Sequence, residues 1–164
     1  MTTVPASDTE PPTVRPATRS DLLAVHRIEK ASFPQPWPFS AFESYVGEPG
    51  FLVAVADDDS DVSVLFGYVV ADTVPNHGTP LGHIKDLAVA PDYRGDGVGR
   101  TLLGRAIGVL EDAGAGSVKL EVRITNAVAI SLYRDFGFEH RRTIPNYYGN
   151  GEDALVMIRA LDGE

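Results

Sequence analysis

Hydrophobic and polar residues alternate strictly over Ser117–Arg123, where every second side chain is apolar. This period of two predicts a strand with one buried face and one polar face. Runs rich in β-branched residues, separated by turn-forming residues, predict further strands. They lie around Val14 and over Phe51–Ala56, Val62–Val70, Leu81–Val89, Phe138–Ile144 and Asp153–Ala160, with Asp57–Asp61 as the turn between the second and third.

Apolar residues recur at helical spacing in three other stretches, which predicts helices over Asp21–Ala31, Val98–Ala113 and Asn126–Phe136. Thr18 and Ser20 offer N-caps to the first, and Gly114 and Gly137 end the other two. The three prolines of Phe33–Pro38 exclude a helix there, and a short helix is predicted over Phe39–Val46. The order β-α-α-β-β-β-α-β-α-β-β predicts an α/β fold with a mixed central sheet and helices on both faces.

With 164 residues and 43% hydrophobic content, the chain fits one domain, which we place over residues 13–161. Residues 1–12 are predicted to form a disordered leader, because they are polar and rich in proline. They have neither the basic start nor the apolar stretch of a signal peptide. No apolar run approaches the roughly 20 residues of a membrane span.

The net charge of −9 argues against partners such as nucleic acid or anionic membrane. The chain has no cysteine, which excludes disulfides, thiolate metal sites and a cysteine nucleophile. We expect a cytoplasmic protein that is a monomer or a weak dimer. Its acidic surface, with only the lysines Lys30, Lys85 and Lys119, suits a salt-rich, halophilic cytoplasm as well as an ordinary one.

A glycine-rich loop, Arg94–Gly99, joins the strand at Leu81–Val89 to the helix at Val98–Ala113. Free amides at a helix N-terminus bind anions, and glycines let a ligand approach the backbone. We therefore predict a pyrophosphate cradle here. The loop lacks the lysine and the glycine spacing of a P-loop, and it lacks the G-x-G-x-x-G spacing of a dinucleotide-binding fold.

The loop fits the pattern [QR]-x-x-G-x-[GA] through Arg94, Gly97 and Gly99, and it resembles the coenzyme A loop of the GNAT (GCN5-related N-acetyltransferase) superfamily. The segments Leu120–Asn126, Ala129–Phe138 and Asn146–Ala154 are similar to the RimI-like branch. The resemblance is strong over Gly82–Arg159 and weaker over Val14–Tyr45. It implies the GNAT fold, acetyl-CoA as cosubstrate and transfer of its acetyl group to the N-terminal α-amine of proteins or peptides, with a ribosomal protein among the possible targets.

The same resemblance implies three catalytic side chains. Glu121 matches the general base, and the alternative is a carboxylate that only pairs with Arg123 or Lys119. Tyr133 matches the acid that protonates the departing thiolate, and the alternative is a core aromatic residue. His83 matches an alternative base of some archaeal relatives, or else it is an ordinary histidine on a strand.

For the coenzyme, the resemblance implies a splayed fourth strand whose backbone binds the pantetheine arm, with the Val89 N–H at the thioester oxygen. The cofactor-binding residues are then Leu87, Ala88, Val89, Arg94, Gly95, Asp96, Gly97, Val98, Gly99, Arg100, Asn126 and Tyr133. Asp96 is expected to face solvent, because a carboxylate repels phosphate. Asn126 is alternatively a plain helix cap.

For the substrate, the resemblance implies a peptide groove between Phe33–Phe39 and the last hairpin loop. Its residues are Gln35, Trp37, Tyr147 and Tyr148; Trp37 is alternatively core, and the tyrosines are alternatively exposed turn residues. Some eukaryotic relatives carry a glutamate near Gln35. No metal is expected. Rival functions are an acetyltransferase for a lysine side chain or a small amine, and a non-catalytic coenzyme-A-binding module.

Overall fold

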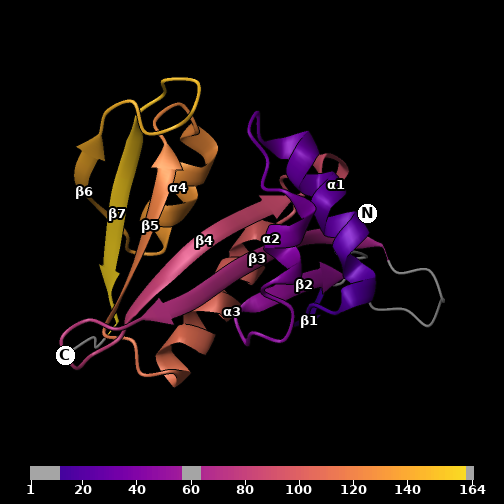
Figure 1. Ribbon diagram of the computed structural model, residues 1–164, viewed down its shortest axis with the longest axis horizontal. Helices are drawn as coiled ribbons and strands as arrows, with labels where there is room; N and C mark the ends of the chain where they lie inside the picture. Colours follow the sequence, from indigo (N-terminus) through magenta and orange to yellow (C-terminus); the bar gives the residue numbers. More distant parts are fainter. Residues whose placement is uncertain (1–11, 57–63, 162–164) are drawn as a thin grey trace, which may run out of the picture.

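A computed structural model describes residues 12–56 and 64–161, and its element order confirms the predicted one (Figure 1). The predicted leader, apart from Pro12, and the Asp57–Asp61 turn lie outside the described residues. The elements are β1 (Thr13–Pro16), α1 (Leu22–Ser32), α2 (Phe39–Glu43), β2 (Phe51–Val55), β3 (Leu65–Val74), β4 (Leu81–Val89), α3 (Val98–Asp112), β5 (Ser117–Arg123), α4 (Ala127–Asp135), β6 (Glu139–Ile144) and β7 (Ala154–Ala160), with 3-10 turns at Arg19–Asp21 and Pro91–Tyr93.

Two elements end three or more residues away from their predicted last residue. Helix α2 ends at Glu43 rather than at Val46. Strand β3 continues past Val70 to Val74, because its last residues pair with the start of β4. Pairing with the next strand of the chain therefore extended β3 beyond the point where local sequence preference ended it.

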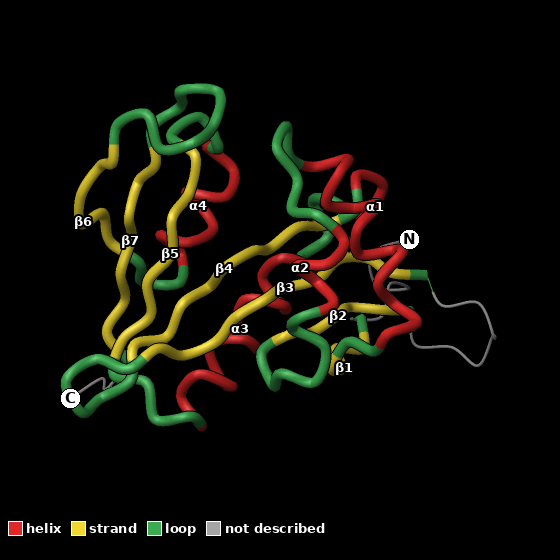
Figure 2. The backbone as a smooth tube through the Cα atoms, in the orientation of Figure 1, coloured by secondary structure: helices red, strands yellow, loops and turns green. Residues whose placement is uncertain are grey.

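The strands form one mixed sheet in the order β1-β2-β3-β4-β5-β7-β6, in which β4 and β5 run parallel and the other neighbours run antiparallel. Helices α1 and α2 cover one face, and α3 and α4 cover the other (Figure 2). Each face buries its own hydrophobic cluster. None of the described helices has the length and apolar character that crossing a membrane requires.

Strands β4 and β5 separate in the middle of the sheet. Their pairing covers only Leu81–Ile84 against Ser117–Leu120, and beyond it the two strands diverge like the arms of a V (Figure 1). A β-bulge accompanies the separation, because Asp86 pairs with Val70 while Ile84 pairs with the next residue, Ala71. The extra residue, Lys85, turns the chain, so that Ile84 packs under α3 while Asp86 lies on the face that α1 covers.

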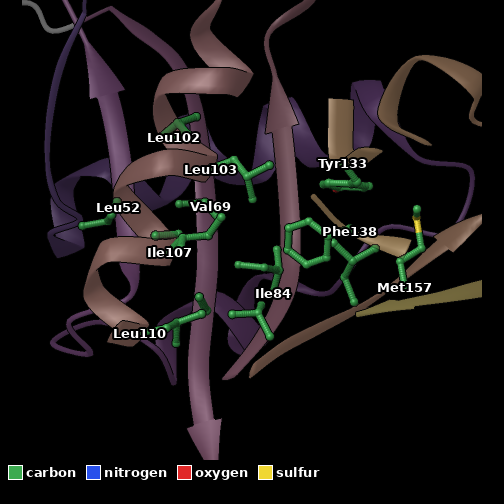
Figure 3. Packing of buried hydrophobic residues seen from close by; sticks show 14 of the residues in the cluster. Leu52, Val69, Ile84, Leu102, Leu103, Ile107, Leu110, Tyr133, Phe138 and Met157 are labelled. Carbon is green, nitrogen blue, oxygen red and sulfur yellow. The ribbon is translucent and has the colours of Figure 1, made fainter. Parts of the chain in front are cut away.

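The α3 side of the sheet holds the larger core, in which Leu102, Leu103, Ile107 and Phe138 pack together (Figure 3). Burying a side chain of this size stabilises the fold by about 1.5–3 kcal/mol. Tyr133 of α4 packs edge-on against Phe138, with ring centroids 5.9 Å apart. This core therefore fixes both α3, which carries the glycine loop, and the α4 tyrosine that faces the opening between β4 and β5.

Candidate active site

The glycine loop leads into α3 with backbone amides exposed at the helix end. Gly95 and Gly97 have φ of +88° and +86°, which is the left-handed region that other residues rarely adopt. The first helical hydrogen bond of α3 runs from the Thr101 N–H to the Gly97 carbonyl. The amides of Val98–Arg100 precede it and have no carbonyl within the helix to pair with. The local geometry therefore fits the predicted anion cradle.

The last residues of β4 present an open backbone edge. The Val89 carbonyl accepts a hydrogen bond from Arg94 Nε at 2.9 Å, whereas the next residue, Ala90, donates its N–H to Phe66 beside β3. Since the N–H and C=O of one strand residue point to the same edge, the Val89 N–H faces the gap between β4 and β5. Arg94 also donates to Ser32 Oγ at 2.9 Å and so connects the glycine loop to the end of α1.

A cavity of about 230 Å³ opens where β4 and β5 part. Its walls come from α1 and the segment after it, from β4 and β5, from α4 and from the β6–β7 loop. The lining residues are Glu29, Phe33, Gln35, Trp37, Ile84, Lys85, Asp86, Leu87, Leu120, Glu121, Val122, Arg123, Asn126, Ala129, Tyr133 and Tyr148.

Glu121 lies in this cavity and binds two basic side chains. His83 Nε2 is 2.9 Å from Glu121 Oε1, and Lys119 Nζ is 3.3 Å from Oε2. The hydrogen bond with His83 holds the pKa of Glu121 below its usual value, although burial opposes that shift. Glu121 is therefore an ionised carboxylate at neutral pH. His83 is not among the lining residues and meets the cavity through Glu121.

Tyr133 reaches the same cavity from α4, on the other side of the opening. Its side chain is 7% exposed. Burial, together with the nearby Asp86 and Tyr148, raises the pKa of its phenol above the usual value. The phenol is consequently protonated over the whole physiological range. The predicted base and acid come from elements on opposite sides of the gap and line one space.

The two predicted substrate walls touch. Gln35 Oε1 accepts a hydrogen bond from the Gly149 N–H at 2.9 Å, which joins the segment after α1 to the β6–β7 loop. Tyr148 lines the cavity, and its ring lies 3.9 Å from the Arg123 guanidinium carbon. Burial raises the pKa of Tyr148 to about 12, although Arg123 opposes this.

The remaining predicted residues divide between surface and packing positions. Tyr147 is 49% exposed and contacts Tyr148 edge-on. Trp37 stacks on Tyr45 and also lines the cavity, so it is both a packing and a wall residue. Asn126 caps α4 by accepting the Ala129 N–H at 3.2 Å. Asp96 is exposed, as expected.

Arg100 pairs with Asp135 and so links α3 to α4. Within residues 12–56 and 64–161, no group of three or more histidine, aspartate or glutamate side chains is arranged to hold a metal ion.

Sequence reasoning missed two carboxylates in the cavity wall, the buried Glu29 and the half-buried Asp86. A signal for Glu29 was present, since it occupies the apolar face of α1 next to Ile28 and is 2% exposed. Asp86 had a weaker signal, since it is only a charged residue inside a run of β-forming residues. The face of the sheet on which it lies is set by the bulge at Lys85, which the sequence did not predict.

The Acetyltransferase (GNAT) family profile matches residues 22–138. This chain belongs to the GNAT family. It is 34% identical over 155 residues to the N-alpha-acetyltransferase of Sulfolobus acidocaldarius, covering 90% of this chain and 92% of that protein. It is 33% identical over 141 residues to the [ribosomal protein bS18]-alanine N-acetyltransferase of Escherichia coli K12, covering 84% and 90%.

Among solved structures, that of Ard1 from Thermoplasma volcanium aligns with a TM-score of 0.80 and 26% identity, over 91% of this chain and 97% of that one. The resemblance to RimI-like acetyltransferases and the predicted GNAT fold are thereby confirmed.

Proposed function

We propose that this protein transfers the acetyl group of acetyl-CoA to the N-terminal α-amine of proteins or peptides. The observation that supports this most directly is the shared cavity of Glu121 and Tyr133 where β4 and β5 part. Curated relatives over nearly the full length are named N-alpha-acetyltransferase and [ribosomal protein bS18]-alanine N-acetyltransferase.

The amides at the start of α3 would hold the diphosphate of the coenzyme, with Gly95 and Gly97 providing the backbone conformation. The open edge of β4 over Leu87–Val89 would bind the pantetheine arm as an added strand does. The Val89 N–H faces that edge and would donate a hydrogen bond to the thioester oxygen as negative charge develops there.

Glu121 would accept the amine proton. A free α-amine has a pKa of about 7.7–8.0, so roughly one tenth is neutral at pH 7. The neutral nitrogen attacks the thioester carbonyl carbon, and its proton becomes strongly acidic as the N–C bond forms. An ionised carboxylate is then a sufficient base, directly or through one water. His83 would keep Glu121 ionised and oriented.

Tyr133 would donate a hydrogen bond from its phenol to the coenzyme sulfur while the C–S bond breaks. Its raised pKa means that the proton is present at the start of each turnover. Because a free thiol has a pKa of about 8.5, the phenol is the weaker acid. A strong hydrogen bond to the developing thiolate is therefore its main contribution, and solvent completes the proton exchange.

Gln35, Trp37, Tyr147 and Tyr148 would form the groove for the first residues of the substrate, with a ribosomal protein as one possible target.

We further infer a cytoplasmic protein that works without nucleic acid or membrane, as a monomer or a weak dimer, with a halophilic source suggested by its acidic composition. Residues 13–161 would form the whole catalytic domain.

The test is a peptide library offered with acetyl-CoA and read by mass spectrometry. Each peptide carries a lysine and is supplied with a free or a blocked α-amine. Acetylation confined to free α-amines is expected. Acetylation of lysine in blocked peptides would instead indicate the rival side-chain specificity, and tight acetyl-CoA binding without thiol release would indicate a binding module.

A further inference from the structure

Three side chains from three elements meet at the edge of the cavity. The Tyr68 hydroxyl on β3 donates a hydrogen bond to Glu29 Oε1 on α1, and it lies 3.5 Å from Asp86 Oδ2 on β4. Tyr68 is 0% exposed and Glu29 is 2% exposed. Both carboxyl groups also line the cavity that contains Glu121 and Tyr133.

This cluster holds two carboxyl groups and no cation. Neither Glu29 nor Asp86 forms an ion pair with any residue in the described part of the chain. Lys85 is next to Asp86 in sequence, but its ammonium nitrogen lies 3.8 Å from Asp72. Two ionised carboxylates sharing a buried site repel each other, so one of them retains a proton.

The proton belongs on Asp86. Burial and the neighbouring Glu29 raise the pKa of Asp86 well above that of an ordinary aspartate. The phenols of Tyr68 from β3 and Tyr133 from α4 interact with Asp86, and their pKa values are also raised. Both phenols therefore stay neutral, and neither changes the electrostatic balance between the two carboxyl groups. Tyr148 and three charged side chains share the cavity, and each charged one has another partner: Lys85 lies near Asp72, Arg123 pairs with Glu152, and Glu121 pairs with His83 and Lys119.

Each carboxyl group also fixes a backbone amide of the site. Glu29 Oε2 accepts the Trp37 N–H at 2.9 Å, in the segment that forms one wall of the peptide groove. Asp86 Oδ1 accepts the Leu87 N–H at 3.0 Å, at the start of the open edge of β4. The cluster thus connects the peptide wall to the strand along which the coenzyme arm would lie.

We propose that Glu29, which shares a hydrogen-bonded cluster with Tyr68 and Asp86, is a positioning residue that holds the Trp37 wall against the C-terminal end of β4. The kinetic part of this inference rests on the proposed peptide acetylation. Glu29 uses a different oxygen for each of these donors, and an amide at position 29 places an NH₂ donor where one of the two oxygens stood, so either the Trp37 N–H or the Tyr68 hydroxyl loses its acceptor. An amide at position 86 mimics a neutral carboxyl group.

The experiment compares Glu29→Gln with Asp86→Asn in the full chain, with Glu111→Gln on the exposed surface of α3 as the matched control. Glu29→Gln is expected to raise the peptide KM at least tenfold while the acetyl-CoA KM changes less than threefold. Asp86→Asn is expected to raise the peptide KM less than threefold and to abolish the alkaline rise in KM that ionisation of Asp86 causes in the unmodified protein. A Glu29→Gln variant with a peptide KM within threefold, or an Asp86→Asn variant as impaired as Glu29→Gln, would overturn the proposal.

Two spectroscopic measurements separate this inference from the proposed function. In protein labelled with ¹³C at the aspartate carboxyl groups, the signal lost in Asp86→Asn should have the chemical shift of a protonated carboxyl at pH 7. The Trp37 amide proton should lose protection from exchange in Glu29→Gln but keep it in Glu111→Gln. An ionised Asp86 or an unchanged Trp37 amide refutes the inference, whereas failure of the unmodified protein to acetylate any peptide refutes only the proposed function.

Discussion

His83 Nε2 lies 2.9 Å from Glu121 Oε1, and only the glutamate of this pair lines the cavity. The histidine approaches from β4, one residue before the pairing of the two strands ends, and the glutamate approaches from β5, one residue beyond that end. The predicted base and the predicted alternative base are therefore one hydrogen-bonded unit, and we propose that His83 acts on the reaction through Glu121.

Replacing Glu121 with glutamine should lower kcat about 100-fold or more, the usual contribution of a general base. The acetyl-CoA KM should change less than threefold, because the coenzyme would bind along β4 and α3. Steady-state kinetics with a free-amine peptide checks this. A kcat within threefold of the unmodified protein would show that another group accepts the proton.

The pH profile should report the His83 contact. Because His83 lowers the pKa of Glu121, the carboxylate stays ionised at pH values below the usual pKa of a glutamate. In His83→Ala that pKa should rise toward the usual value, so kcat/KM should fall at a higher pH on the acidic side. His140→Ala, on exposed β6, should leave the profile unchanged. If kcat/KM falls at the same acidic pH in all three proteins, the hydrogen bond from His83 does not control the ionisation of the catalytic base.

Tyr133→Phe should separate catalysis from packing. The phenylalanine keeps the edge-on contact with Phe138, so the melting temperature should not fall. Removing the phenolic hydroxyl should lower kcat at least tenfold, since a hydrogen bond to a charged group contributes about 1.5–3 kcal/mol. Thermal unfolding and thiol-release assays on the same sample measure both. Unchanged kcat would place the proton donor elsewhere, most simply in solvent.

The glycine loop can be tested with two alanine substitutions, one at the N-cap of α3 and one about three turns further along the same helix. Gly97 has φ of +86°, where an alanine costs about 1–2 kcal/mol, so Gly97→Ala should weaken both stability and acetyl-CoA binding. Gly108 lies inside α3 with free space around it, so Gly108→Ala should stabilise the protein by roughly 0.5–1 kcal/mol. Calorimetric titration with acetyl-CoA should show weaker binding only for Gly97→Ala, and equal affinities would argue against the cradle.

Gln35→Ala removes the bridge between the two groove walls. A hydrogen bond contributes about 0.5–1.5 kcal/mol net, so the peptide KM should rise about two- to tenfold while the acetyl-CoA KM stays constant. Ser40→Ala, on the exposed surface of α2, serves as the control. Equal rises in both variants would mean that the contact between Gln35 and Gly149 does not shape the groove.

Local pattern was sufficient wherever one physical signal dominated. The alternation over Ser117–Arg123 matches the observed burial residue by residue, because a half-buried strand must alternate. The glycines at 95 and 97 marked the turn into α3, since their backbone conformation excludes most other residues. Asn126 was recognisable as a helix N-cap, because its side-chain oxygen can accept a hydrogen bond from a free amide in the first turn. The catalytic assignments, in contrast, came from resemblance to a family and stay predictions.

The sequence by itself determined the order of the elements, the glycine loop and the residue types available for proton transfer, because these follow from short-range periodicity and backbone preference. The tertiary structure decided which of those side chains meet. A bulge at Lys85 turned Asp86 toward Glu29, the parting of β4 and β5 opened the cavity, and a loop contact over more than a hundred residues joined Gln35 to Gly149. Such contacts depend on strand register and on packing between distant segments, which no local pattern encodes.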